Sequence, residues 1–341
     1  MSELIVRPDV VRQNTVAVST LLGRHGLILV GVTKAVLGEP TIARAMLDGG
    51  AQALADTRDA NLARLRKVFP ETEIHRLHLP VPGRSFVPGS VNYVSSAAGL
   101  DALVDVFSLQ AGERLPARVL LLVETGDGRE GSPVDEVTAL AEEVVSDPNL
   151  DFYGVGTNYA CFTGPRHQLA ESVNRLAGVV GSLERAGLRP ERVSAGNSAL
   201  LGLLADGASL PEPVTEIRCG EALLFGHDTL HYRLLPGAAG PACVVKAEVL
   251  ERYTKASGTS AAPRAVLNIG SQDLGTFPVG FSASSGEEVV PVEVGRSSDY
   301  LVVEEVEGCG PLEPGRLVDV FPSYYALVAA WTSPFVEVRF E

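Results

Sequence analysis

The chain lacks the features of several protein classes. It has four cysteines in 341 residues, and no two of them form a C-x-x-C pair. A structural zinc site or a disulfide framework is therefore not expected. We expect instead a reducing, cytoplasmic location. No apolar run approaches the roughly 20 residues that cross a bilayer. The opening residues, MSELIVRPDV, lack the apolar core of a signal peptide. We expect a cytoplasmic protein with no membrane partner.

Basic residues are also scarce. The chain has 28 Lys and Arg residues against 42 Asp and Glu residues, a formal net charge of −14. This balance argues against binding to nucleic acid or to an anionic membrane surface, and weakly favours cationic small molecules. The six histidines are scattered and show no metal-ligand spacing, so no metal site is expected. The length and the apolar content suit a large domain with a sizeable core and a smaller second domain.

The first two thirds of the chain alternate between short apolar runs and amphipathic stretches. This pattern is typical of parallel strands joined by crossover helices. Eight such runs in about two hundred residues predict a closed (β/α)8 barrel of the TIM type. An open α/β sheet is the alternative, because periodicity does not show closure. The runs cover residues 27–33, 53–55, 73–79, 91–94, 117–123, 152–157, 192–195 and 216–218.

The pattern changes after about residue 235. Short β-prone runs follow, and turns rich in Gly and Pro separate them, which predicts a C-terminal all-β domain. We place the barrel at residues 13–235 and the β domain at residues 236–341. Residues 1–12 form an N-terminal segment that could add a strand to the β domain.

Lys34 directly follows the first apolar run, in the sequence LILVGVTKAVLG. In a barrel of this type, active sites lie at the C-terminal ends of the strands. A lysine at the mouth of an apolar core loses hydration, which lowers its pKa and frees a neutral amine. A neutral lysine amine forms a Schiff base with an aldehyde cofactor. The simpler alternative is a strand-end lysine that extends to solvent.

Two loops after the last barrel strands could hold an anion. In SAGNSALLGLL, residues Gly196–Ser198 precede an apolar helix, so exposed backbone N–H groups and the Ser198 hydroxyl could face a phosphate. The backbone at Gly220 and Glu221 could add donors to the same phosphate. An ordinary capped helix is the more frequent use of such a pattern.

Other strand-end residues have both a functional and a structural interpretation. Arg218 would point into the barrel mouth, or form a salt bridge. Arg129, in the loop ETGDGREG, could bind a carboxylate with two hydrogen bonds, or belong to a surface turn. Asn158 could lie against a flat ligand, or be structural. Cys161 has no base near it in sequence, so we expect it in the core.

Taken together, the motifs resemble one enzyme family. The motifs are VTKAVLG, LADTRDANLARL, ETGDGREG, GVGTN, SAGNS, EIRCGEALLFGHDTL, IGSQDL, SSDY and YYALVAAWTSPFV. In this order they resemble the fold-type III pyridoxal-phosphate (PLP) enzymes, the alanine racemase-like family, and within it the ornithine and lysine racemase-like branch. The resemblance implies a barrel followed by a β domain, in a head-to-tail homodimer with shared active sites.

The resemblance also implies roles for individual residues. Lys34 would hold the cofactor, Arg218 would face the pyridine nitrogen, and Arg129 would lie near the substrate carboxylate. The implied phosphate contacts are Ser198, the backbone near Asn197, Gly220 and Glu221, and the side chain of Tyr324. Asn158 stands where alanine racemases carry a histidine that contacts the cofactor ring.

The implied activity is an amino-acid racemase or epimerase that works through an aldimine at Lys34 and α-proton transfer. Arg218 cannot give up its proton, so the pyridine nitrogen stays unprotonated and the ring is a weaker electron sink. This favours reversible loss of the α-proton. A basic or specialised amino acid is the expected substrate. The alternatives are a PLP-dependent decarboxylase or lyase on the same fold, and a non-catalytic PLP-binding protein.

The sequence departs from the alanine racemase pattern at two tyrosines. Gly38 stands where a tyrosine follows the cofactor lysine, and Tyr253 is out of register with the catalytic tyrosine early in the β domain. A racemase that uses two bases needs an acid/base group on each face of the α-carbon. We expect the second one from the SSDY turn of the partner subunit, at Asp299 or Tyr300, with Asp273 as another candidate.

Overall fold

The computed structural model describes residues 2–83, 87, 89–109, 116–161, 166–254, 262–282, 291–306 and 310–341. Cys309 lies outside these residues. The chain divides into two compact units. The barrel unit comprises Val11–Gly240, and the β unit comprises Met1–Val10 together with Pro241–Glu341.

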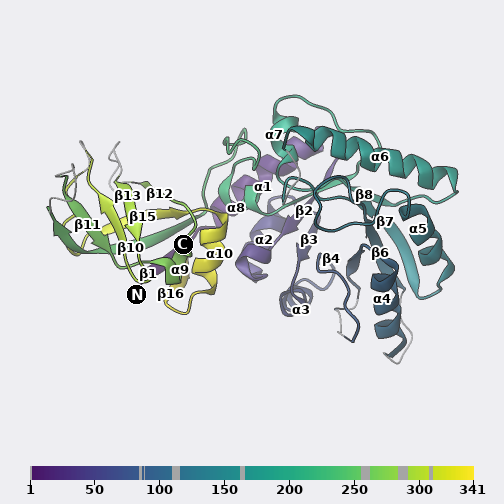
Figure 1. The fold of residues 1–341 in the computed structure, drawn as a ribbon, viewed down its shortest axis with the longest axis horizontal. Helices are drawn as coiled ribbons and strands as arrows, with labels where there is room; N and C mark the ends of the chain where they lie inside the picture. The colour runs from purple at the N-terminus through teal and green to yellow at the C-terminus, as the bar shows by residue number, and fades with distance from the viewer. Residues whose placement is uncertain are drawn as a thin grey trace. The chain divides into compact units, whose positions relative to one another are not determined.

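Eight parallel strands of the barrel unit pair side by side and close into a barrel (Figure 1). The prediction of a closed (β/α)8 barrel is confirmed, and each of the eight apolar runs overlaps one strand. The strands are β2 (Ile28–Val32), β3 (Ala53–Asp56), β4 (Glu73–Arg76), β5 (Val91–Val94), β6 (Ala117–Leu122), β7 (Leu150–Gly156), β8 (Arg192–Ser194) and β9 (Glu216–Cys219).

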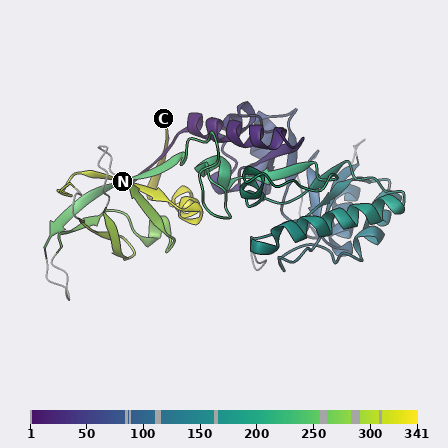
Figure 2. The same ribbon diagram turned by 90° about the horizontal axis from the view of Figure 1, so that it is seen from above.

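Helices cover the outside of the barrel, and Figure 2 shows the long helix α6, in teal, along it. Helix α2 illustrates how the sequence sets them. Pro40 occupies its first turn, the Glu39 side chain accepts a hydrogen bond from the Thr41 N–H at 3.2 Å, and its apolar face is buried. The helices are α1 (Pro8–Gly23), α2 (Pro40–Asp48), α3 (Asp59–Val68), α4 (Ala97–Leu109), α5 (Val137–Ser146), α6 (Leu169–Arg185), α7 (Leu200–Ala205) and α8 (Glu221–Phe225).

The β unit is built on a mainly antiparallel sheet in the order β12-β15-β10-β11-β14-β13. Strand β1 (Ser2–Val6) pairs with β10 and with β16, so the first residues of the chain belong to this sheet. Its other elements are β10 (Cys243–Tyr253), β11 (Arg264–Leu267), α9 (Ser271–Leu274), β12 (Val279–Ser282), β13 (Val292–Arg296), β14 (Leu301–Glu304), β15 (Leu317–Pro322), α10 (Tyr324–Thr332) and β16 (Val336–Phe340).

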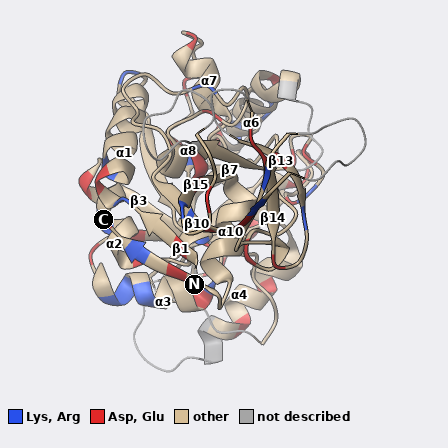
Figure 3. Ribbon diagram, turned by 90° about the vertical axis from the view of Figure 1, so that its left-hand side faces the viewer, with Lys and Arg blue, Asp and Glu red and all other residues tan. Residues whose placement is uncertain are grey.

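Charged residues are spread over both units. Figure 3 shows basic residues gathered on α3, which carries Arg64, Arg66 and Lys67. Among the helices of the described ranges, none has the length and apolar character to cross a membrane.

Candidate active site

Lys34 begins a short 3-10 turn, Lys34–Val36, two residues beyond the end of β2. The turn is fixed from the neighbouring strand by Asp56, which is fully buried at the end of β3. The Thr33 hydroxyl donates to Asp56 Oδ2 at 2.7 Å. The other carboxylate oxygen, Oδ1, accepts hydrogen bonds from Thr57 N, Arg58 N and Asn61 Nδ2 at 2.7, 3.1 and 3.0 Å. Asp56 therefore holds the backbone from which Lys34 extends.

Lys34 is an exposed residue by its surface area, yet many protein atoms crowd around its ammonium group. Desolvation is the main cause of a lowered pKa for its ammonium group. Arg129 and Arg218 lower this pKa further, while Cys161 and Asp56 act in the opposite direction. These side chains come from the ends of four different strands, so barrel closure gathers them around one lysine. The lowered pKa favours the neutral amine that Schiff-base chemistry requires.

The structure explains why glycine occupies position 38. Gly38 has a φ of +63°, in the left-handed region that favours glycine. A Cβ atom there would lie 2.8 Å from the Cβ of Asn61, which also contacts the Asp56 carboxylate. No tyrosine can be placed at this position without moving α3, so the departure from the alanine racemase pattern is built into the backbone.

The loops after β8 and β9 form a cradle of backbone amides. Within the residues that the structure covers, the N–H groups of Asn197, Ser198, Gly220 and Glu221 have no acceptor. The Ala222 N–H donates to Ser198 Oγ at 3.4 Å, which ties the two loops together. A Cβ on Gly220 would lie 2.9 Å from the Val32 carbonyl oxygen, so this close approach needs glycine. Free N–H groups converging from two loops suit a phosphate.

A cluster of amides lies beside this cradle. Asn197 Nδ2 lies 3.0 Å from Asn158 Oδ1, 2.8 Å from the Tyr159 carbonyl and 3.0 Å from Cys161 Sγ. Asn158 Nδ2 is buried and finds no hydrogen-bond acceptor among the described residues. An unpaired buried donor is costly, so its position suits a ligand that carries acceptor atoms.

Cys161 does not lie in the core. Its side chain is exposed, and it interacts electrostatically with both Lys34 and Arg129. The prediction of a core residue is wrong because it considered only neighbours in sequence. The groups that contact Cys161 come from the loops after β2, β6 and β8. By contrast, Cys219 is buried, and desolvation raises the pKa of its thiol to about 12.

Arg218 is buried inside the barrel, with 6% of its surface exposed. Its guanidinium donates from Nη1 to Ser194 Oγ, and from Nη2 to the Thr157 carbonyl at 2.7 Å. Its Cζ atom lies 5.3 Å from the centre of the Tyr93 ring. Two hydrogen bonds and the aromatic ring thus fix the orientation of this cation.

Arg129 lies in the loop after β6, and its guanidinium donates hydrogen bonds from Nε and Nη2 to the Glu130 carboxylate. This hydrogen bonding is the main cause of the raised pKa of Arg129. The loop itself is folded by Glu124, whose Oε2 accepts from the Gly128 N–H at 3.0 Å. A carboxylate ligand would therefore meet Arg129 at Nη1, which has no partner among the described residues.

The other predicted site residues belong to the β unit. Tyr324 is the first residue of α10. In the turn between β13 and β14, Asp299 Oδ1 accepts a hydrogen bond from Gln272 Nε2 at 3.3 Å, and Tyr300 is 48% exposed. Asp273 accepts hydrogen bonds from Gly270 N at 3.1 Å and Ser333 Oγ at 3.2 Å, so it has a structural role. The roles of Tyr324, Asp299 and Tyr300 at Lys34 stay predictions.

Comparison with known proteins identifies the family. The sequence profile of the alanine racemase N-terminal domain matches residues 6–228, and the chain belongs to this family. The lysine racemase of Thermotoga maritima is 27% identical over 362 residues, with 99% of this chain and 98% of that protein covered. The ornithine racemase of Acetoanaerobium sticklandii is 24% identical, with 96% of each covered.

Solved structures show the same fold. Alanine racemase from Corynebacterium glutamicum superposes with a TM-score of 0.74 at 18% identity, and covers 100% of this chain and 99% of that one. Alanine racemase from Streptomyces lavendulae superposes with a TM-score of 0.73 at 21% identity, with 100% of this chain and 97% of that chain covered. The predicted resemblance to fold-type III PLP enzymes is confirmed, and with it the expected cofactor and the expectation of an enzyme. The lysine with lowered pKa, the amide cradle and the unpaired Asn158 donor all fit PLP.

Proposed function

We propose that this protein is a PLP-dependent racemase that interconverts the L and D forms of a basic amino acid such as lysine or ornithine. The observation that carries the proposal is the desolvated Lys34, with a lowered pKa, among Arg218, Arg129 and Cys161. The names of the two relatives support the substrate class. The net charge of −14 also favours a cationic substrate.

The site residues of the barrel unit each have a task in this proposal. Bound PLP supplies an aldehyde for reversible attachment of the amino acid and a ring that makes its α-hydrogen acidic. Lys34 would hold the cofactor, and its neutral amine would take and return the α-proton on one face. The cradle of amides with the Ser198 hydroxyl would bind the phosphate. Arg218 would face the ring nitrogen and keep it unprotonated, because a guanidinium does not give up its proton.

The opposite face needs a second acid/base group. We propose that the SSDY turn of a partner subunit supplies it through Asp299 or Tyr300, in a head-to-tail homodimer with shared sites. Tyr324 would add a hydroxyl at the phosphate, Asn158 would contact the ring, and Arg129 would receive the substrate carboxylate at Nη1. The boundaries at residues 12 and 235, and a cytoplasmic location, belong to the same proposal.

The test is a deuterium assay. The protein with added PLP is incubated in D2O with single enantiomers of a broad amino-acid panel, and the mass and chirality of each product are measured. Incorporation of one deuterium with inversion of lysine or ornithine is the expected result. Exchange without inversion would show that only one face is active, and release of CO2 would indicate a decarboxylase instead. Lys34→Ala should abolish turnover, while Lys67→Ala, at an exposed lysine of α3, should not. Turnover by Lys34→Ala would contradict the proposal.

A further inference from the structure

The Asn197 side chain is held in one orientation by two backbone groups. An amide keeps nearly the same shape when it is turned over, so its hydrogen-bond partners decide which way it faces. Its oxygen, Oδ1, accepts a hydrogen bond from the Ala199 N–H at 2.9 Å. Its nitrogen, Nδ2, donates to the Tyr159 carbonyl at 2.8 Å. A backbone N–H only donates and a carbonyl only accepts, so the reversed amide would lose both hydrogen bonds.

The orientation of Asn197 determines that of Asn158. Asn197 Nδ2 also donates to Asn158 Oδ1, which lies 3.0 Å away. Cys161 Sγ lies as close to this nitrogen, but sulfur is a weak acceptor, so the amide oxygen is the stronger partner. With its oxygen turned toward Asn197, Asn158 directs its NH2 group the other way. There Nδ2 is buried and finds no acceptor among the described residues, an arrangement that is costly until a ligand supplies one.

The segment from Asn158 to Cys161 is held from two sides. Ala160 has a φ of +58°, in the left-handed region that residues other than glycine rarely adopt. The Cys161 N–H donates to Asp127 Oδ1 at 3.2 Å, and Asp127, in the loop after β6, is 2% exposed. Asn197, in the loop after β8, holds the other side. Backbone strain of this kind persists where the surroundings fix it, and it is concentrated at functional sites.

Bound PLP has one acceptor that the other site residues leave without a partner. The cofactor carries an aldehyde, a ring nitrogen, a phosphate and a phenolic oxygen beside the aldehyde. In the proposed function, Lys34 holds the aldehyde carbon, Arg218 faces the ring nitrogen and the amide cradle binds the phosphate. The phenolic oxygen remains, and in its ionised form it accepts strong hydrogen bonds. Asn158 follows β7, between the strand that precedes Arg129 and the strand that precedes the cradle.

We propose that Asn197 is a positioning residue, which turns the Asn158 amide so that its NH2 group donates to the phenolic oxygen of the cofactor. The inference rests on the proposed function, which places the other groups of PLP. It gives Asn158 a specific hydrogen bond instead of a general contact with the ring. It also gives the Asn197 side chain a role separate from that of its backbone N–H, which belongs to the phosphate cradle.

Arg129 is a competing donor for the same oxygen. Its Nε and Nη2 donate to Glu130, while Nη1 has no partner among the described residues. A guanidinium would bind an ionised phenolic oxygen well. If Arg129 serves this oxygen, then replacing Arg129 should weaken PLP binding only when the phenolic oxygen is present. If Asn158 serves it, only the replacement of Asn158 should show that dependence.

The first measurement compares two ligands, PLP and 3-deoxypyridoxal phosphate, which lacks the phenolic oxygen. Asn158→Ala should weaken PLP binding about tenfold and leave the affinity for the analogue unchanged. Equal losses for both ligands would overturn the proposal, because they would place the Asn158 donor at another group of the cofactor. A loss that depends on the phenolic oxygen in Arg129→Lys, and not in Asn158→Ala, would also overturn it.

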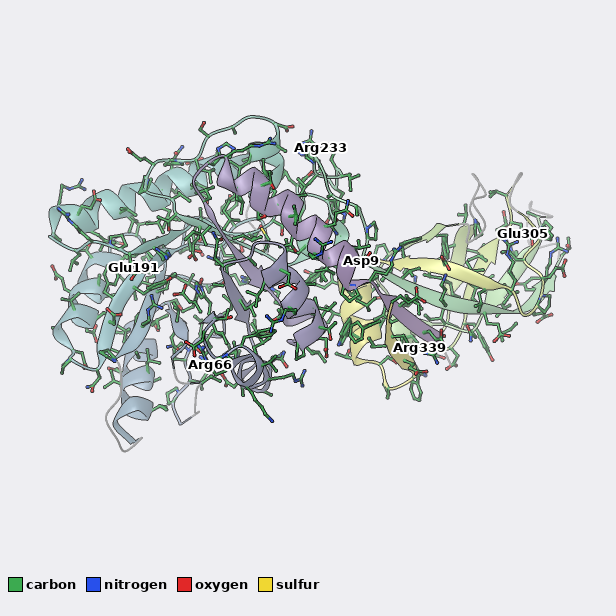
Figure 4. All side chains as sticks on the ribbon, turned by 180° about the vertical axis from the view of Figure 1, so that it is seen from behind. Asp9, Arg66, Glu191, Arg233, Glu305 and Arg339 are labelled. Carbon is green, nitrogen blue, oxygen red and sulfur yellow. The ribbon has the colours of Figure 1, made fainter. Side chains whose placement is uncertain are left out.

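Asn149 provides a matched control. It precedes β7, at the end of the barrel where Glu191 is labelled in Figure 4. Its Nδ2 donates to Asp147 Oδ1 at 2.9 Å within an exposed loop. Asn149→Ala therefore removes an amide from the opposite end of the same strand. It should bind both ligands as tightly as the wild type does.

The second measurement tests the positioning role. In Asn197→Ser, the hydroxyl can still accept from the Ala199 N–H, but no NH2 group remains to orient Asn158. This variant should bind PLP several-fold more weakly and bind the analogue normally. When it is combined with Asn158→Ala, it should cause no further loss. Additive losses, or an equal loss for the analogue, would assign Asn197 to the phosphate cradle alone and overturn its positioning role.

The third measurement uses the protein without cofactor. Asn158→Ala removes an unpaired buried donor together with an accepted hydrogen bond, so the urea midpoint should stay close to that of the wild type. A large fall would assign Asn158 to the stability of the fold and overturn the proposal. A wild-type protein that binds no PLP would overturn the proposed function and this inference with it. Tight PLP binding that Asn158→Ala leaves unchanged would overturn only the inference.

Discussion

Replacing Asp56 tests whether one buried carboxylate holds the turn that carries Lys34. Asp56→Ala removes the acceptor of four hydrogen bonds, from Thr33 Oγ1, Thr57 N, Arg58 N and Asn61 Nδ2. Two of these donors, Thr33 and Asn61, are buried, with 0% and 5% of their surfaces exposed. Water cannot reach these two buried donors to replace the carboxylate, so their lost hydrogen bonds account for most of the destabilisation.

The size of the effect follows from these donors. A buried donor left unpaired costs about 1–3 kcal/mol, and hydrogen bonds to a charged group are at the upper end. Thr33 keeps a second acceptor, the Ala55 carbonyl at 3.2 Å, which reduces its share. We expect Asp56→Ala to lower the free energy of unfolding by about 3–5 kcal/mol. PLP affinity should fall as well, because Thr33 directly precedes Lys34.

Urea unfolding measures the stability, and titration of the visible absorbance of bound PLP measures the affinity. Asp56→Asn is the matched variant, since its amide oxygen can keep the three N–H donors and its NH2 group can donate to Thr33 Oγ1. It should lose much less stability than Asp56→Ala. Because the charge of Asp56 raises the pKa of Lys34, Asp56→Asn should lower that pKa further. A loss below about 1 kcal/mol for Asp56→Ala would refute the reasoning.

Three more predictions concern the barrel unit. Burial alone would raise the pKa of Glu73, but hydrogen bonds from three neighbouring side chains outweigh this effect and lower it. The folded-state pKa of Glu73 lies below its unfolded value, so its contribution to stability is full above about pH 5 and is lost progressively as the pH falls from there toward the folded-state pKa. Glu73→Gln should therefore cost about 2 kcal/mol at pH 7, and the difference from wild type should shrink in acid. In a Cys309→Ser background, bound PLP should protect Cys161 from iodoacetamide, while the buried Cys219 stays unreactive; unchanged alkylation would separate Cys161 from the site. Gly220→Ala should weaken PLP binding about tenfold, and Gly178→Ala, where no atom lies within 4 Å of a new Cβ, should not.

The sequence predicted the barrel because most of its strands are local apolar runs that alternate with helical stretches. Lys34 could also be placed, since it directly follows such a run. The hydrogen bonds that join Glu73, His75 and Tyr93 could not, because Tyr93 lies 18 residues from His75 and meets it only when β4 and β5 pair in the barrel. In sequence, His75 looked like one of several scattered histidines. The inward alternation of polar residues in EIHR was the one signal available.

Two elements of the β unit also escaped prediction. Helix α10 reads YYALVAAWT, which is apolar along its length, and its N-cap residue Ser323 makes no side-chain cap hydrogen bond. Because apolar residues fill its whole length, it shows no helical periodicity that would predict it. Strand β12 could not be predicted, because Gly280 and the short span Val279–Ser282 give little β signal.

The pairing of β1 constrains the order in which the protein can be built. Glu3 lies opposite Lys246 of β10 and Glu337 of β16, so β1 pairs with strands that are synthesised only after the whole barrel. The barrel helices and strands are complete before that moment. Such long-range pairing slows folding and leaves a strand edge unpaired in the meantime. A fragment of Pro241–Glu341 alone would leave the β10 and β16 edges without the strand that joins them, so supplying residues 2–6 as a separate peptide should restore its fold.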